Sequence, residues 1–142
     1  MISTMSLAAF DHGELEQFTR AFEELFYAAD ARSMTSYYTE QAHLMADGMM
    51  PIQGHDAIEQ FWSIAIDRAA AAGARRTVQL HESHSSGELG YALCTVTVEI
   101  PGHPRRAVWD TTVWRQDADG RWRIAVDIST LLPSEPQDAS QL

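Results

Sequence analysis

Apolar residues recur every three or four positions along two long stretches in the first half of the chain, which predicts two amphipathic helices. The first stretch follows Asp11, a residue type that caps helix starts, with Glu14 three positions later. The second runs from Gly54 to Gly73, and glycine commonly ends a helix. The two apolar stripes are Leu15, Phe18, Phe22, Leu25 and Phe26, and then Ile58, Phe61, Trp62, Ala65 and Ile66.

Two shorter elements are predicted between these helices. Asp30 can cap a second, shorter helix, to which we assign Met34, Tyr37 and Tyr38. Residues 42–46 then have the composition of a short strand. The first half of the chain is therefore expected to contain three helices and one strand.

From residue 76 onward the pattern is that of β-strands. Four runs rich in Val, Ile, Thr and Trp are separated by short segments of Gly, Pro, Ser and Asp, which favour turns. The last two runs flank Asp117-Ala118-Asp119-Gly120, a strong signal of a β-hairpin. The four predicted strands lie near residues 77–83, 89–100, 107–116 and 121–130.

The predicted order of elements, α-α-β-α-β-β-β-β, is typical of an α+β domain. We expect a cone-shaped barrel in which the three helices pack on the concave face of a curled antiparallel sheet, with a hollow between them. Large apolar side chains on the other sheet face predict a homodimer through that outer face. Residues 1–132 are expected to form a single domain, and the polar residues 133–142, which include two prolines, a disordered tail.

Composition narrows the class of protein. The 142 residues are 45% hydrophobic and 21% charged, as in an ordinary globular domain, and no apolar run approaches the roughly 20 residues of a membrane span. The net charge of −10, with only ten Lys and Arg, argues against a nucleic-acid surface. No basic N-terminal region precedes an apolar core, so we expect no signal peptide and a cytoplasmic protein.

Two carboxylates lie among strand residues that look buried. Asp110 shares a strand face with Thr112 and Trp114, and Asp127 alternates with apolar residues of the last strand. A carboxylate in an apolar environment has a raised pKa, which suits it to general acid or base catalysis. Two alternatives stay open. In one, either Asp forms an ion pair with Arg105, Arg106 or Arg115. In the other, Asp127 lies on a solvated face beside Arg123, because the opposite face of the strand is the more apolar: Trp122, Ile124, Val126 and Ile128.

His43, on the first strand, is a further candidate for the pocket. His81 and His84 are three residues apart, which places them on opposite faces of a strand, and no carboxylate pattern completes a metal site. Cys94 is the only cysteine, so a Cys-based metal site is excluded in one chain; we expect no metal and no cofactor. Aromatic residues and methionines are predicted to line the hollow, with plain core packing as the alternative: Phe22, Phe26, Trp62, Trp114, Met45 and Met50.

Two segments resemble the nuclear transport factor 2-like superfamily, and within it the SnoaL-like and ketosteroid-isomerase-like group. One is the helix start Gly54-His-Asp-Ala-Ile-Glu-Gln-Phe-Trp, and the other is the hairpin from Val113-Trp-Arg to Asp119-Gly-Arg-Trp-Arg-Ile. The resemblance covers residues 12–132 and implies the cone fold. The superfamily includes isomerases, cyclases, hydrolases, dehydratases and non-catalytic binding modules, so the resemblance implies the fold more strongly than a reaction.

The resemblance also suggests roles for single residues. The three catalytic positions of ketosteroid isomerases fall on Phe22, on Ala46 and near Thr112, none of which has the required side chain. In SnoaL-like polyketide cyclases an acid on the last strand is the general acid/base, and Asp127 resembles it. We therefore expect cofactor-independent acid/base chemistry on a small hydrophobic ligand, in which Asp127 moves the proton and Asp110, with His43, holds the substrate oxygen. The alternative is a non-catalytic ligand-binding or dimerisation module.

Overall fold

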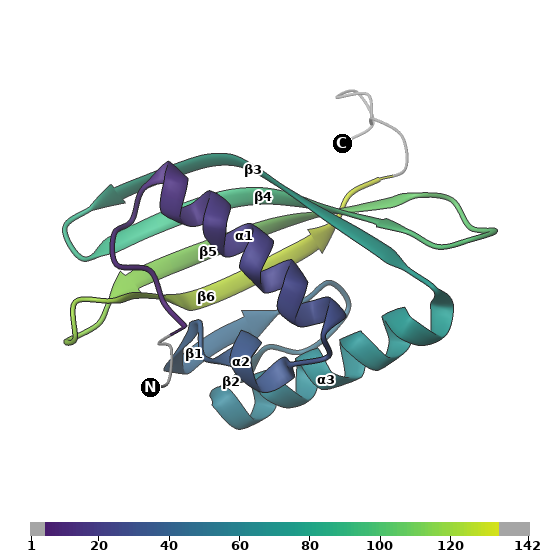
Figure 1. Ribbon diagram of the computed structural model, residues 1–142, viewed down its shortest axis with the longest axis horizontal. Coiled ribbons are helices and arrows are strands. Elements are labelled where there is room, and N and C mark those ends of the chain that lie inside the picture. Colours follow the sequence, from purple (N-terminus) through teal and green to yellow (C-terminus); the bar gives the residue numbers. More distant parts are fainter. Residues whose placement is uncertain (1–4, 134–142) are drawn as a thin grey trace.

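The computed structural model describes residues 5–133, and the predicted disordered tail lies outside this range except for Pro133. The α+β class and the predicted order of helices and long strands are confirmed (Figure 1). A two-residue strand that the sequence pattern did not indicate is added between the first long strand and the third helix. The elements are α1 (His12–Tyr27), α2 (Ala31–Thr35), β1 (Tyr38–Met45), β2 (Ile52–Gln53), α3 (His55–Ala72), β3 (Arg75–Ser86), β4 (Leu89–Glu99), β5 (Arg106–Gln116) and β6 (Trp122–Leu131).

The strands form one open six-stranded sheet in the order β2-β1-β6-β5-β4-β3. The four long strands β3 to β6 follow one another as an antiparallel meander, as predicted. β1 pairs with β6 in parallel, so the sheet is mixed rather than wholly antiparallel. This pairing brings residues from the start and the end of the chain side by side, and it matters for the site described below.

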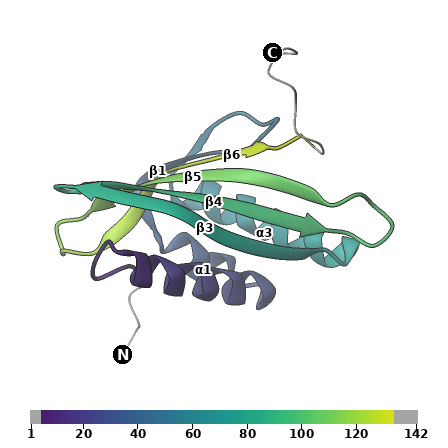
Figure 2. The same cartoon turned by 90° about the horizontal axis from the view of Figure 1, so that it is seen from above.

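The helix boundaries follow the capping signals of the sequence. The Asp11 side chain accepts a hydrogen bond from the backbone N of Glu14 over 2.8 Å at the start of α1. Gly73 ends α3 in the left-handed conformation, with φ of +66°. α1 crosses the sheet face, and α3 lies at the end of the sheet that holds β1 and β2 (Figure 1). The edge-on view shows α1 on one side of the sheet (Figure 2).

The second helix is shorter than predicted. The Asp30 side chain caps it by accepting from the backbone N of Ser33 over 3.1 Å, but the helix ends at Thr35. Placing Tyr37 and Tyr38 in this helix is wrong, because Tyr38 is the first residue of β1 and pairs with Ile124 of β6. The run Tyr-Tyr-Thr has the aromatic and β-branched character that favours a strand.

A β-bulge interrupts the regular alternation of β6. Trp114 of β5 pairs with Ile124, whereas its neighbour Val113 pairs with Val126, so Ala125 is an extra residue. Before the bulge the even-numbered residues of β6 face the helices, and after it the odd-numbered residues do. This is why Ile124 is 1% exposed and Asp127, three residues later, is only 7% exposed.

The outer face of the sheet includes His81, whose ring stacks on Trp109 at a centroid distance of 5.7 Å. Dimerisation through this face stays a prediction. No helix in the described part of the chain is long and apolar enough to cross a membrane.

Candidate functional site

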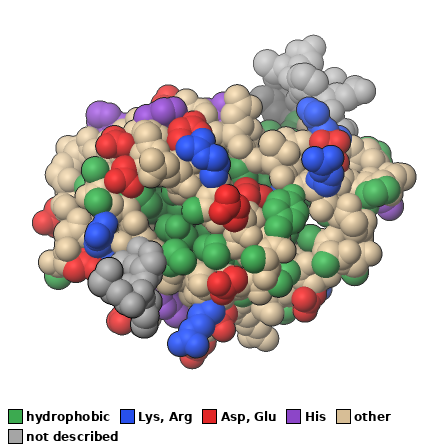
Figure 3. Space-filling model, viewed as in Figure 1, with side chains coloured by type: hydrophobic (Ala, Val, Ile, Leu, Met, Phe, Trp, Pro, Cys, Tyr) green, Lys and Arg blue, Asp and Glu red, His purple; other side chains and the backbone are tan. Residues whose placement is uncertain are grey.

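A pocket of about 430 Å³ lies between the helices and the inner face of the sheet. Its wall is mostly apolar and aromatic, with contributions from α1, α3 and all the long strands. On the face of the molecule that α1 crosses, hydrophobic side chains gather in the middle, and acidic side chains interrupt them (Figure 3). A concave, largely apolar space with few polar groups is the usual form of a small-molecule site.

Asp110 and Asp127 both face this pocket. Thr112 lies between them in the register: it is the cross-strand partner of Asp127, and it is two residues from Asp110 on β5. The two aspartates are thus diagonal neighbours on one face of an antiparallel pair, close enough for their side chains to interact. Asp127 faces the pocket as the resemblance implied, and the alternative that it points outward does not hold, because the bulge at Ala125 turns both Ile124 and Asp127 inward.

A buried chain of hydrogen bonds holds Asp127. The Tyr38 hydroxyl donates to Oδ2 of Asp127 over 2.6 Å. The indole Nε1 of Trp62 in turn donates to the Tyr38 hydroxyl oxygen over 3.2 Å. Tyr38 reaches Asp127 because β1 pairs in parallel with β6, and Trp62 approaches both from α3. A hydroxyl donor aimed at a carboxylate oxygen fixes the orientation of that side chain.

Burial raises the pKa of Asp110 well above its ordinary value of 3.8, and the charge of Asp127 and a hydrogen bond with Asp127 raise it further. The positive charge of Arg76 opposes these effects. The Asp110 carboxyl group therefore keeps its proton to a higher pH than an ordinary aspartate does. Burial, followed by the charge of Asp127, also raises the pKa of Tyr38 well above 10.0, which keeps its hydroxyl a donor.

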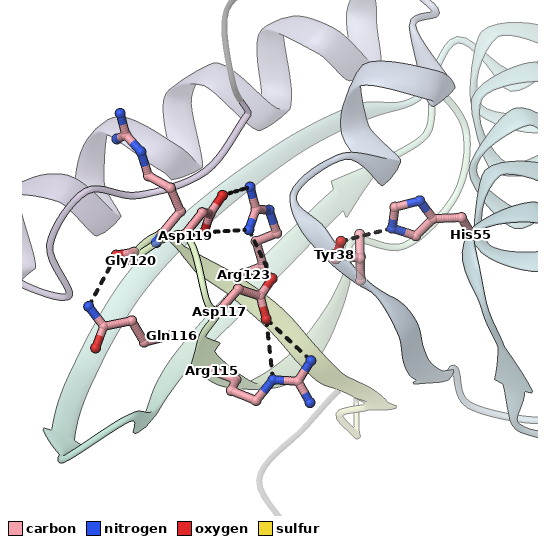
Figure 4. A network of polar contacts seen from close by, with 9 residues as sticks. Tyr38, His55, Arg115, Gln116, Asp117, Asp119, Gly120 and Arg123 are labelled. Carbon is pink, nitrogen blue, oxygen red and sulfur yellow. Dashed lines mark hydrogen bonds and ion pairs between the residues drawn. The ribbon is translucent and has the colours of Figure 1, made fainter.

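Arginines near the hairpin turn do not pair with either aspartate. Arg115 and Arg123 both point toward Asp117, at the turn between β5 and β6 (Figure 4). Arg123 also pairs with Asp119 over 2.8 Å, and this hydrogen bond lowers the pKa of Asp119 to about 2. The alternative that Arg115 neutralises Asp127 or Asp110 in an ion pair is therefore wrong.

A pair of oppositely charged side chains also lines the pocket. Glu23 of α1 pairs with Arg76 of β3, and both side chains are largely buried. The Arg76 guanidinium lies over the ring of Phe26, 4.7 Å from its centroid, and 5.6 Å from that of Trp62. Burial raises the pKa of Glu23, although the charge of Arg76 opposes this rise.

The structure brings together only some of the residues that the sequence suggested for the site. Asp110 and Asp127 share the pocket, and the four predicted aromatic residues, Phe22, Phe26, Trp62 and Trp114, line it. The placement of His43, Met45 and Met50 in the pocket is wrong. His43 and Met45 are exposed because β1 turns the alternate residues Ala42 and Leu44 inward, and Met50 is 81% exposed in the loop before β2.

Sequence reasoning missed Tyr38, Glu23 and Arg76. Tyr38 was assigned to a helix, and the irregular register of β1 hides which face its side chain takes. Arg76 could have been found, since it precedes Val78 and Leu80 at a spacing of two, and all three face the pocket. Glu23 follows Phe22 on α1 and gave no separate signal.

Cys94 also lines the pocket, as the cross-strand partner of Asp110. Burial, followed by the charges of Asp110 and Asp127, raises the pKa of its thiol to about 12, so it is not an activated nucleophile. Within residues 5–133 no group of three or more His, Cys, Asp and Glu side chains is arranged to hold a metal ion.

Solved structures of similar shape share this fold at low sequence identity. A protein of unknown function with a cystatin-like fold from Nostoc punctiforme has a TM-score of 0.73 and 17% identity, over 92% of this chain and 98% of that one. A ketosteroid isomerase-like protein from Erwinia carotovora atroseptica has a TM-score of 0.67 and 17% identity, over 83% of this chain and 93% of that one. A nuclear transport factor 2-like protein from Novosphingobium aromaticivorans has a TM-score of 0.69 and 17% identity, over 89% of this chain and 93% of that one.

No curated protein matches the chain. The family model described as the SnoaL-like domain matches residues 15–124, which span α1 to the first part of β6 and include Asp110 and Tyr38. Because this match covers most of the chain, the protein belongs to the SnoaL-like domain family.

Proposed function

We propose that this protein binds a small hydrophobic molecule in the pocket and performs cofactor-independent acid/base chemistry on it. The observation that supports this most strongly is the pair Asp110 and Asp127, which face one apolar pocket while Tyr38 donates a hydrogen bond to Asp127. A carboxyl group that keeps its proton, beside a second carboxyl group, supplies an acid and a base in one place.

In this proposal Asp127 is the base and Asp110 the acid. Asp127 takes a proton from the carbon beside a substrate carbonyl, and the electron pair of that C–H bond moves toward the carbonyl oxygen. Asp110 donates its proton, or a hydrogen bond, to that oxygen as negative charge develops there. Tyr38 and Trp62 position Asp127 without touching the substrate oxygen.

The surroundings favour this step. A mostly apolar wall lowers the local dielectric constant, so the interaction between a developing oxyanion and the Asp110 proton is stronger than in water. Return of the proton to a different carbon gives an isomerase, loss of a β-hydroxyl group as water gives a dehydratase, and attack on a second carbonyl gives a cyclase. These reactions share the first proton transfer, which can therefore be tested before the substrate is known.

Exchange of hydrogen for deuterium tests that transfer. The wild-type protein is incubated in D₂O with a panel of apolar aryl and cyclic ketones, and loss of the α-proton signal is followed by ¹H NMR. We expect exchange above the buffer rate for at least one ketone, and a loss of roughly a hundredfold or more in Asp127→Asn and Asp110→Asn. Asp67→Asn, at an exposed site on α3, is the matched control and should exchange like the wild type.

Exchange that survives in Asp127→Asn would contradict the assignment of the base. Binding of the ketones, measured by calorimetry, without any exchange in the wild type would instead favour the non-catalytic ligand-binding module.

A further inference from the structure

The contact between Glu23 and Arg76 leaves hydrogen-bonding capacity unused inside the pocket. Oε1 of Glu23 accepts a hydrogen bond from Nη1 of Arg76. The other carboxylate oxygen, Oε2, is buried and has no hydrogen-bond partner among the described residues. A buried charged acceptor without a donor costs stability, because the water that solvated it has been removed. A bound ligand with a hydrogen-bond donor would satisfy this oxygen.

Arg76 is held in a fixed position beside Glu23. The Tyr27 hydroxyl, at the end of α1, accepts from the backbone N of Arg76 over 2.7 Å and donates to its backbone O over 3.1 Å. The guanidinium also lies against Phe26 and Trp62. Among residues 5–133 only its Nη1 has a side-chain acceptor, so further N–H donors are available to a ligand oxygen.

The charges of the Glu23–Arg76 pair select against ionic ligands. Glu23 and Arg76 form a pair of zero net charge, so neither an anion nor a cation gains a net attraction to it. An anionic ligand would also approach the two aspartates and a chain of net charge −10. A neutral group that both donates and accepts, such as a hydroxyl, can meet the free Glu23 oxygen and the Arg76 donors together.

We infer that the pocket takes a neutral apolar molecule with two oxygen groups: a carbonyl at the aspartates and a hydroxyl that donates to Glu23 and accepts from Arg76. The carbonyl end rests on the proposed function, whereas the hydroxyl end rests on Glu23 and Arg76 alone. The inference therefore names the substrate class of the same site and can fail separately from the proposed reaction.

Three probes of one shape test the hydroxyl end: 6-acetyl-2-naphthol, its methyl ether, and 6-acetyl-2-naphthoic acid. Their dissociation constants are measured by calorimetry at a pH below neutral, at which the naphthol is un-ionised. We expect the naphthol to bind about tenfold more tightly than the methyl ether, which cannot donate, and the carboxylate to bind most weakly. Equal affinity for naphthol and ether, or tightest binding of the carboxylate, would overturn the inference.

Glu23→Gln removes the charge while keeping the shape. We expect the preference for naphthol over the methyl ether to fall to about threefold or less, and the carboxylate to gain affinity because Arg76 loses its counter-ion. Glu24→Gln, at an exposed position next along α1, is the matched control and should retain the wild-type preference. An unchanged preference in a folded Glu23→Gln protein would contradict the inference, and the wild-type comparison stands even if that variant does not fold.

The same probes separate this inference from the proposed function, because the acetyl protons of each can be followed for deuterium exchange. Exchange without a preference for the naphthol overturns only the inference about Glu23 and Arg76. A preference for the naphthol without exchange overturns only the proposed chemistry at Asp110 and Asp127.

Discussion

Ile124 and Asp127 lie three residues apart on β6, yet both side chains face the pocket. In a regular strand they would take opposite faces. The extra residue Ala125 changes the parity, so the strand contributes an apolar wall before the bulge and a carboxylate after it. Bulges often re-aim side chains next to functional sites, and this one brings Asp127 to the diagonal of Asp110.

The hydroxyl of Tyr38 should contribute measurably to stability. Tyr38→Phe leaves the buried Nε1 of Trp62 without an acceptor and removes the donor to Asp127. We expect the free energy of unfolding, measured by urea denaturation, to fall by about 1–3 kcal/mol.

Tyr91→Phe is the matched control for this variant. The Tyr91 hydroxyl donates to Glu82 over the same 2.6 Å, but the pair lies at the surface, where water replaces the lost bond. We expect no measurable change. If Tyr38→Phe and Tyr91→Phe lowered the free energy of unfolding equally, burial of the Tyr38 hydrogen bonds would add nothing to their contribution to stability.

Asp110 should make the fold less stable as pH rises. Between 3.8 and the raised pKa of Asp110, the folded chain keeps a proton that the unfolded chain has lost. Stability therefore declines as pH rises through this window, by at most about 1.4 kcal/mol per pH unit from this group. Asp110→Asn removes this contribution, so the variant should gain stability over the wild type as the pH approaches neutrality.

Urea denaturation of both proteins between acidic and neutral pH measures this difference. Glu23, whose pKa burial also raises, is present in both chains, so its contribution largely cancels in the comparison. Parallel stability profiles for wild type and Asp110→Asn would show that Asp110 ionises alike in the folded and unfolded chain. A large loss of stability in the variant would instead make the carboxyl group a structural one.

Much of the fold could be predicted from the sequence because its signals are local. Asp11, Asp30 and Gly73 mark helix ends through their own backbone and side-chain chemistry, and the hairpin at Asp117 to Gly120 follows from its turn residues. Pairing between distant segments has no such local signal. The parallel contact of β1 with β6 was therefore missed, and with it the position of Tyr38.

The residue types of the site were predictable, but alternation along a strand gave the correct orientation for only some of the side chains. Asp110 lies in a regular strand, so its face could be inferred from Thr112 and Trp114. For Asp127 simple alternation favoured the wrong face, because a bulge depends on how two strands pair and not on one strand alone. The prediction for His43 was wrong although β1 alternates regularly at this point. Ala42 and Leu44 face the core, so the His43 side chain between them is exposed to solvent.

Cys94 should react slowly with thiol reagents in the folded protein. A thiol with a pKa of about 12 has about a thousandfold less thiolate near pH 8 than one at the ordinary 9.0. Because Cys94 is the only cysteine, the release of thionitrobenzoate from Ellman's reagent reports on it alone. We expect slow modification in buffer and rapid modification in concentrated urea, and fast labelling of the native protein would contradict a buried, protonated thiol.

A large side chain placed in the pocket should weaken binding of the probe without lowering the stability of the fold. Ala69 lines the pocket from α3, whereas Ala71, two residues later, is exposed and lies outside it. Ala69→Phe places a ring in the apolar space, so the melting temperature should stay level or rise while the affinity for the acetylnaphthol probe falls at least tenfold. Ala71→Phe makes the same substitution on the same helix without entering the pocket, and it should bind the probe as the wild type does. If both variants bind equally well, the probe lies elsewhere on the molecule, and the pocket between α1, α3 and the sheet is core space rather than a binding site.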